Sequence, residues 1–294
     1  MSNFKYFIQF ILIVPLFLFF KLSGLNIASF LGGKLFEIIG PFFRSKHVIH
    51  SNIKKAFPSI SLKDTKKITK QMWNNYGRVF SEYMFIKDYR NNLFKSHITI
   101  KGQEILKNIK KNDKPVIFIS GHLSNFELMA MTIEKFGIKL AAIYRPLNNH
   151  FLNILMERIR KKYICKYQIK KGIGGLREIV KLNKSGFSTA LMIDQRVSQG
   201  IKSNFFNHLA FTTTIPAQLV KKYNYPIVPL FIERFEGTKF KITVQNPIHF
   251  SKQNSEKEIT EKLNNLLEKM ILIFQVDYLI FRLFLFLNFV LKNE

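Results

Sequence analysis

The sequence predicts an α/β fold in which a mixed central sheet is flanked by helices. Short β-rich runs occur at 115–120, 140–144, 188–193, 226–231 and 239–244, and helical stretches separate most of them. This alternation is typical of α/β architectures. An apolar run at 7–20 adds an N-terminal helix ahead of the sheet.

Composition narrows the class of protein. The 294 residues are 47% hydrophobic, which excludes intrinsic disorder, and the lone Cys165 excludes an intramolecular disulfide. The sequence has neither a CxxC pair nor a His/Cys cluster, so the usual zinc frameworks are excluded. The net charge of +27 favours an anionic partner, although a compositionally biased genome would also produce a Lys-rich chain. No nucleic-acid-binding signature is present, so we expect a membrane surface or an acidic or phosphorylated partner.

The first 44 residues are predicted to attach the protein to a membrane. The apolar run lies between Lys5 and Lys21 and is interrupted by Gln9 and Pro15. It is short for a bilayer span, which needs about 20 apolar residues. No clear signal-peptide cleavage site follows it, so we interpret it as an uncleaved anchor. The helix either crosses the membrane at a tilt or lies in the headgroup region of one leaflet.

Residues 45–270 are predicted to form one domain, followed by an apolar tail at 271–294. Near its start, Ser61-x-x-Asp64 indicates the beginning of a long helix. Apolar residues then recur at helical spacing, which predicts a core-facing stripe of Ile68, Met72, Tyr76, Val79 and Tyr83.

The candidate site follows the 115–120 run, where His122 comes at the expected carboxyl edge of the sheet. His122 and Glu127 are five residues apart, so they meet only if His122 lies in a loop and Glu127 in the first helical turn. The carboxylate would then hold one imidazole nitrogen while the other accepts a proton from a hydroxyl. Alternatively, Ser124-x-x-Glu127 is a helix capping box and His122 is structural.

Several blocks in order resemble the bacterial lipid A biosynthesis late acyltransferases, the lauroyl and myristoyl transferase family. The resemblance spans residue 1 to about residue 270. The blocks are Asn52-Ile-Lys-Lys-Ala-Phe-Pro58, Asn75-Tyr-Gly-Arg78-x-x-x-Glu82, Gly121-His122-x-x-x-x-Glu127, Tyr144-Arg145-Pro146, Met192-Ile-Asp194-Gln-Arg196, Thr212-Thr-Thr214, Pro226-Ile-Val-Pro229 and Glu233-Arg234.

The resemblance implies a glycerolipid-acyltransferase-like fold at the cytoplasmic face of the bacterial inner membrane. It also implies transfer of an acyl chain from acyl carrier protein to a hydroxyl of a phosphorylated, Kdo-bearing lipid A precursor. No cofactor or metal is implied, since acyl-acyl carrier protein is the co-substrate. Two alternatives remain: another glycolipid or glycerol-phosphate acceptor, or a catalytically impaired relative that binds lipid or carrier.

Four catalytic residues follow from the resemblance. His122 would be the general base and Glu127 its partner. Arg145 would bind a lipid A phosphate or stabilise oxyanion charge, and Asp194 would fix Arg145 or the acceptor sugar. The substrate-binding residues implied by the same blocks are Asn125, Tyr144 and Arg196.

A basic stretch between these blocks is a further candidate for substrate binding. Its cations suit an anionic headgroup, the acceptor phosphates or acyl carrier protein, unless the stretch is simply a solvated helix face. They are Arg158, Arg160, Lys161 and Lys162.

The sequence departs from the family at two places. Asn207 stands where members usually have Gly, and because Asn tolerates left-handed backbone we expect the turn to survive. The tail lacks an expected Trp/Tyr-x-x-His-x-Arg-aromatic motif and becomes apolar. We expect the tail to be a second interfacial helix, a packed segment or an altered end. If the missing motif supports the acceptor pocket, its loss would reduce activity.

Overall fold

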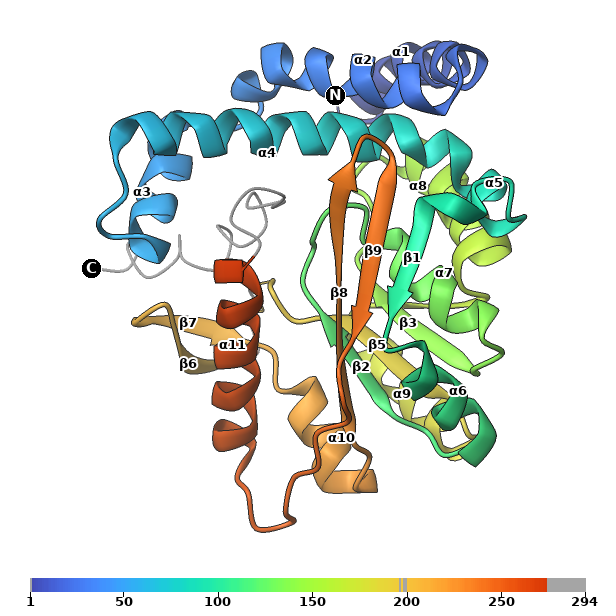
Figure 1. Cartoon of the computed structure of the whole chain (residues 1–294), viewed down its shortest axis with the longest axis vertical. Helices are drawn as coiled ribbons and strands as arrows, with labels where there is room; N and C mark the ends of the chain where they lie inside the picture. The colour runs from blue at the N-terminus through green and yellow to red at the C-terminus, as the bar shows by residue number, and fades with distance from the viewer. Residues whose placement is uncertain (1, 196, 198–199, 274–294) are drawn as a thin grey trace.

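The computed structural model of the protein describes residues 2–195, 197 and 200–273 (Figure 1). The predicted substrate-binding Arg196 and the part of the predicted tail at 274–294 lie outside the described residues.

A seven-stranded sheet in the order β1-β9-β8-β2-β5-β3-β4 forms the centre of the molecule (Figure 1). Its pairs are parallel except for β8 and β9, so the sheet is mixed, as predicted. A separate hairpin pairs β6 with β7. The strands are β1 (Ile98–Lys101), β2 (Ile117–Ser120), β3 (Leu140–Tyr144), β4 (Tyr167–Lys170), β5 (Ser188–Met192), β6 (Ile201–Phe205), β7 (His208–Thr212), β8 (Ile227–Glu236) and β9 (Lys239–Val244).

Helices flank this sheet and continue the chain at both ends. The α-helices are α1 (Ser2–Ser23), α2 (Leu25–Ile39), α3 (Lys46–Ala56), α4 (Leu62–Glu82), α5 (Ile86–Arg90), α6 (Gln103–Asn112), α7 (Glu127–Lys135), α8 (His150–Ile159), α9 (Ile173–Lys184), α10 (Ile215–Tyr223) and α11 (Glu256–Ile273). Short helical segments are η1 (Gly40–Phe42), η2 (Tyr83–Phe85), η3 (Lys95–His97) and η4 (Arg160–Ile164).

The central strands lie where the sequence predicts them. β3 and β9 match their predicted ranges, while β2 and β5 are slightly shorter and β8 extends further, to Glu236. The sequence did not reveal β1 and β4, the two edge strands, or the β6–β7 hairpin. The hairpin turn places Phe206 and Asn207 at φ 49° and 59°, so the left-handed backbone expected at Asn207 is confirmed.

The long α4 helix begins as predicted, because Ser61 caps it by accepting a hydrogen bond of 3.0 Å from the backbone N–H of Asp64. It packs against α2 at very short range. A Cβ atom added to Gly77 would lie 1.9 Å from the carbonyl oxygen of Gly32, so two glycines allow these helix backbones to touch.

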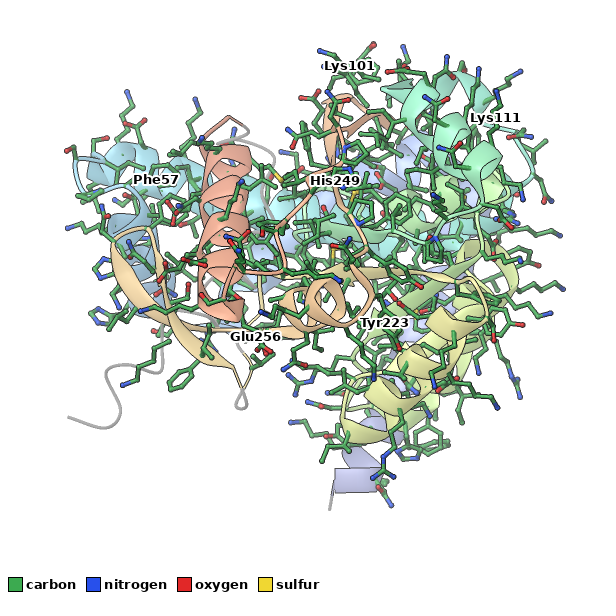
Figure 2. All side chains as sticks on the ribbon, turned by 90° about the horizontal axis from the view of Figure 1, so that it is seen from below. Phe57, Lys101, Lys111, Tyr223, His249 and Glu256 are labelled. Carbon is green, nitrogen blue, oxygen red and sulfur yellow. The ribbon has the colours of Figure 1, made fainter. Side chains whose placement is uncertain are left out.

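The N-terminal helices lie together in one layer above α4 (Figure 1). Within the described residues, one helix is long and apolar enough to cross a membrane, Asn3–Ser23 in α1, with a mean hydropathy of 2.0. From below, side chains with nitrogen tips project around the outline of the molecule, including Lys101 and Lys111 at one edge (Figure 2). This distribution agrees with the net charge of +27.

Candidate active site

Two neighbouring parallel strands bring the principal site residues together. β2 and β5 are paired in a register that sets Ser120 opposite Met192, at the carboxyl end of each strand. His122 comes two residues after Ser120, and Asp194 comes two residues after Met192. Both therefore emerge at the same edge of the sheet, where α/β folds place their ligands.

Asp194 holds His122 by two hydrogen bonds. The backbone N–H of His122 donates to Asp194 Oδ2 at 2.7 Å, and the ring Nδ1 lies 2.6 Å from Asp194 Oδ1. Both side chains are buried. A carboxylate acceptor on Nδ1 favours a proton on that nitrogen and leaves a lone pair on Nε2. Nε2 is thereby prepared to accept a proton, and it lies 3.0 Å from the side-chain amide nitrogen of Gln195.

The loop after β2 has little space around it. A Cβ atom added to Gly121 would lie 3.1 Å from Leu267 Cδ1 and 3.5 Å from Asp194 Oδ2. Further along, the buried Ser124 has φ 41°, a left-handed conformation that costs energy for a residue with a side chain. The surrounding structure therefore holds His122 in a fixed turn.

Glu127 does not hold the imidazole, contrary to the sequence-based prediction. Its Oε1 accepts hydrogen bonds from Arg160 Nε at 2.9 Å and Nη2 at 2.5 Å. The alternative capping box is also not formed, because Phe126 is the N-cap of α7 and no side chain caps it. Glu127 lies in the first turn of its helix, as predicted, but its carboxylate pairs with Arg160, which is 33 residues away in the sequence. Asp194 instead has the orienting role that we expected of Glu127.

Asp194 was predicted to fix Arg145 or the acceptor sugar, and in this structure its carboxylate binds His122. Arg145 follows β3, and the neighbouring β4 is followed by Lys171, whose backbone N–H donates to the carbonyl of Tyr144 at 2.9 Å. Both cations line the same cavity as His122. Burial, together with the charge of Arg145, lowers the pKa of Lys171.

Two cavities meet at His122. The first, which we call the polar cavity, has a volume of about 1010 Å³ including its open mouth. It lies at the carboxyl edge of the sheet, and polar groups of Arg145, Lys171 and Gln195 are part of its lining. The second, which we call the apolar cavity, has a volume of about 900 Å³ including its mouth and lies among α1, α4 and α8. The residues common to both linings are His122, Phe126, Glu127, Leu147 and Arg160.

The apolar cavity changes the interpretation of the predicted α4 stripe. Met72 is buried in the core as expected, but Tyr76, Val79 and Tyr83 form part of the cavity wall. Burial, followed by the charge of Glu127, raises the pKa of Tyr83, so its hydroxyl stays protonated. Helical spacing correctly predicted an inward-facing stripe, and could not distinguish a packed core from a cavity wall.

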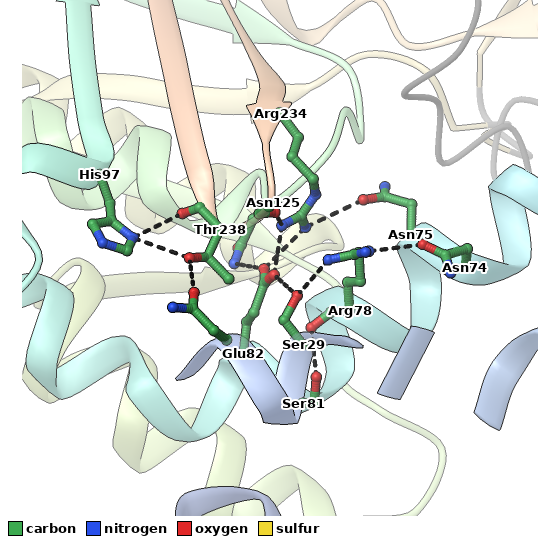
Figure 3. A network of polar contacts seen from close by, with 12 residues as sticks. Ser29, Asn74, Asn75, Arg78, Ser81, Glu82, His97, Asn125, Arg234 and Thr238 are labelled. Carbon is green, nitrogen blue, oxygen red and sulfur yellow. Dashed lines mark hydrogen bonds and ion pairs between the residues drawn. The ribbon is translucent and has the colours of Figure 1, made fainter. Parts of the chain in front are cut away.

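Asn125, predicted to bind substrate, lies in a buried polar network instead (Figure 3). Its Nδ2 donates to Glu82 Oε2 at 3.0 Å. The fully buried Glu82 also accepts from Ser29 at 2.7 Å and forms an ion pair with Arg234. The network ties the loop after His122 to α2, α4 and β8, so these resemblance blocks meet in one structural cluster.

The other predicted substrate-binding residues divide between cavity and surface. Tyr144 lines the polar cavity, with the Arg160 guanidinium 5.7 Å from its ring centroid. Burial, followed by the nearby Glu157 carboxylate, raises the pKa of Tyr144 to about 12. The structure turns Arg160 inward toward Glu127, whereas Arg158, Lys161 and Lys162 are exposed.

The site contains features that sequence reasoning missed, namely the Asp194–His122 and Glu127–Arg160 pairs, Gln195 beside Nε2 and Lys171 beside Arg145. The signal for the first pair was present in the sequence, because both residues follow a β-rich run by a short interval. It becomes informative only once β2 and β5 are known to be neighbours.

Comparison with known proteins is consistent with this geometry. A family model described as bacterial lipid A biosynthesis acyltransferase matches residues 1–284. The chain is 24% identical over 182 residues to lipid A biosynthesis acyltransferase 2 of Shigella flexneri, covering 60% of this chain and 57% of that protein. It is 21% identical over 198 residues to the lipid A biosynthesis myristoyltransferase of Escherichia coli (strain K12), covering 66% and 60%. The matched region thus spans less than two thirds of the length of these relatives.

Proposed function

This chain belongs to the bacterial lipid A biosynthesis acyltransferase family, and from that premise we propose that it transfers a fatty acyl chain to a lipid A precursor. The donor is an acyl carrier protein thioester, and the acceptor is a hydroxyl of a phosphorylated, Kdo-bearing precursor at the cytoplasmic face of the inner membrane. The observation that carries the proposal is the Asp194–His122 contact of 2.6 Å at the junction of the two cavities.

His122 acts as the general base. Asp194 keeps the proton on Nδ1, so Nε2 accepts the proton of the acceptor hydroxyl as its oxygen attacks the thioester carbonyl carbon. The tetrahedral intermediate then collapses, the carbon–sulfur bond breaks, and the proton on Nε2 passes to the departing carrier thiolate. The sequence of steps needs neither a metal nor a covalent enzyme intermediate.

Gln195 occupies the position that the acceptor must reach. Its amide nitrogen lies 3.0 Å from His122 Nε2, so the incoming hydroxyl takes over this hydrogen bond. Developing negative charge on the thioester oxygen is stabilised by cations of the polar cavity, a role supported by the presence of Arg145 and Lys171 in its lining. The same two cations suit an acceptor phosphate.

The two cavities divide the substrates between them. The apolar one, lined by residues such as Phe17, Phe80 and Met156, receives a hydrocarbon chain, and the polar one receives the glucosamine and phosphate groups. Their junction at His122 brings the acyl carbonyl and the hydroxyl to the same atom. The exposed Arg158, Lys161 and Lys162 then face the acidic carrier protein.

Acyl transfer on membranes tests this proposal. Wild-type protein and His122→Ala are supplied with acyl carrier protein thioesters of several chain lengths and the tetra-acylated Kdo-bearing precursor. The product is then identified by its mass in mass spectrometry. We expect one added acyl group with the wild type and a loss of about 10²- to 10⁴-fold in rate with His122→Ala at equal membrane levels. An inactive wild type across all chain lengths contradicts the proposal, and so does an unimpaired variant.

A further inference from the structure

The N-terminal helix α1 is packed against the rest of the protein along its length. Near its start, Asn149 Nδ2 donates to the carbonyl of Tyr6 at 2.9 Å. In its second half, the rings of Phe17 and Phe80 have centroids 4.7 Å apart. At its end, Lys21 forms an ion pair with Asp88. These contacts extend over sixteen residues, 6–21, or about 22 Å of helix.

The opposite side of α1 is exposed and apolar. Phe4, Ile11, Leu18 and Leu22 are 71%, 50%, 60% and 79% exposed, and they fall close to one line along the helix. The neighbouring α2 adds exposed apolar residues, including Phe30. Both helices lie in the layer above α4 (Figure 1), so exposed apolar residues occur on both helices of this outer layer. An apolar surface of this extent marks a site of interaction.

The contacts at both ends of α1 are incompatible with a helix that crosses the bilayer. If α1 stood along the membrane normal, Asn149 and Asp88 would be drawn into the bilayer with it, at heights about 22 Å apart. Polar and charged groups at that depth are costly. With α1 parallel to the membrane surface, the same groups remain on the aqueous side.

We propose that α1 lies in the plane of one leaflet beside α2, as a fixed wall of the enzyme, and does not span the membrane. The occupant of the exposed surface is lipid, because the apolar residues are accompanied by the exposed Lys5, which suits an anionic headgroup, and by the half-exposed Lys34, which lies 3.4 Å from Glu37. Phe17 of α1 also lines the apolar cavity, so a hydrocarbon chain in that cavity lies next to the leaflet. The inference rests on the proposed function only in assigning the protein to a membrane.

Labels at three depths distinguish the two orientations. Phe4→Cys, Ile11→Cys and Leu22→Cys each carry an environment-sensitive fluorophore in vesicles of phosphatidylethanolamine and phosphatidylglycerol that contain shallow or deep quencher lipids. The native Cys165 does not interfere, because it is fully buried. Lys107→Cys, exposed on α6 within the described domain, is the matched control and should remain unquenched.

An in-plane helix predicts the same shallow quenching at all three positions, at about 5–10 Å depth. The proposal is overturned if Ile11→Cys is quenched mainly by the deep quencher while both end positions are shallow, as expected of a span about 30 Å long. It is equally overturned if no position is quenched, and disulfide-linked dimers of the unlabelled cysteine variants under an added oxidant would then identify a second copy of the chain as the occupant. Acyl transfer by the same labelled proteins is measured separately, so a failure of the proposed reaction leaves the depth result interpretable.

Discussion

Replacing Asp194 with asparagine should impair catalysis while preserving the shape of the site. Asp194 Oδ2 accepts from the backbone N–H of His122 at 2.7 Å, and an amide can keep that bond only through its oxygen. Its NH₂ group then faces Nδ1, at the position now 2.6 Å away. Nδ1 must become an acceptor, the proton moves to Nε2, and the base is lost.

The expected loss follows from the buried setting of this pair, whose side chains are 6% and 5% exposed. A hydrogen bond to a charged group contributes about 1.5–3 kcal/mol, which is about 10- to 150-fold in rate. Loss of the correct tautomer costs up to about 10⁴-fold in serine-protease triads. We therefore expect Asp194→Asn to lower kcat/KM by about 10²- to 10⁴-fold, mainly through kcat.

The assay is steady-state acyl transfer with the thioester donor varied, and the exposed Asp64→Asn is the matched control. Glu127→Gln is compared in parallel, because our account assigns its effect first to stability. Activity of Asp194→Asn within about threefold of wild type would refute the tautomer argument. Loss of transfer in Glu127→Gln with unchanged stability would restore Glu127 as the partner of His122.

Three further predictions concern stability and reactivity. Arg160→Met alone should lower the free energy of unfolding by about 3–5 kcal/mol, because it leaves the Glu127 carboxylate buried without its cation. In thermal melts, the double variant Glu127→Gln/Arg160→Met should recover part of this loss. Purely additive losses would contradict the coupling between the two side chains. Gly77→Ala should lower the free energy of unfolding by about 1–3 kcal/mol or more, because the new Cβ forces α4 away from α2. Gly174→Ala, whose Cβ would meet open space, is the control and should be well tolerated. Equal melting temperatures of the two variants would contradict the close approach of the helices. Burial raises the pKa of the Cys165 thiol to about 12, so alkylation at about pH 8.5 should require unfolding. The free energy of unfolding should decline as pH rises past the ordinary thiol pKa, because the unfolded chain then loses the thiol proton first. Rapid labelling of the folded protein would contradict the raised pKa.

The strands predicted well from sequence are those in the middle of the sheet. β2 reads Ile-Phe-Ile-Ser and is buried along its whole length, so it gives a continuous apolar run. The edge strands gave no such signal. β4 reads Tyr-Gln-Ile-Lys, with one face half-exposed, and β1 alternates between half-exposed and exposed residues. An edge strand pairs on one side only, so its composition resembles that of a loop.

His122, Glu127, Arg145 and Asp194 were singled out from the sequence, but their contacts, and the neighbouring Gln195 and Lys171, were not. The sequence allowed a contact between His122 and Glu127, five residues apart, only with His122 in a loop and Glu127 in the first helical turn. The actual partner, Asp194, is 72 residues away and becomes adjacent because β5 lies next to β2. Arg160 was interpreted with its solvated neighbours as part of a basic surface. It alone turns inward, because Glu127 offers a carboxylate inside the cavity.

The family relationship fixes the general chemistry, while the arrangement of charged groups comes from the structure. His122, Glu127, Arg145 and Asp194 all belong to one region, and all but Asp194 line the polar cavity. Asp194 instead contacts His122 through Nδ1 and the backbone N–H, which in the proposed mechanism makes it a positioning residue for the base. The proposed membrane helix belongs to the same region, since α1 contributes Phe17 to the apolar cavity.

A structure of the protein with its acyl acceptor bound would test the central claim most directly. The quantity to measure is the distance from the acceptor hydroxyl oxygen to His122 Nε2. Our account predicts about 2.6–3.2 Å, with the Gln195 amide displaced and Nδ1 still on Asp194. A hydroxyl bound beside Glu127 and away from Nε2, or an imidazole rotated off Asp194 in the complex, would contradict it.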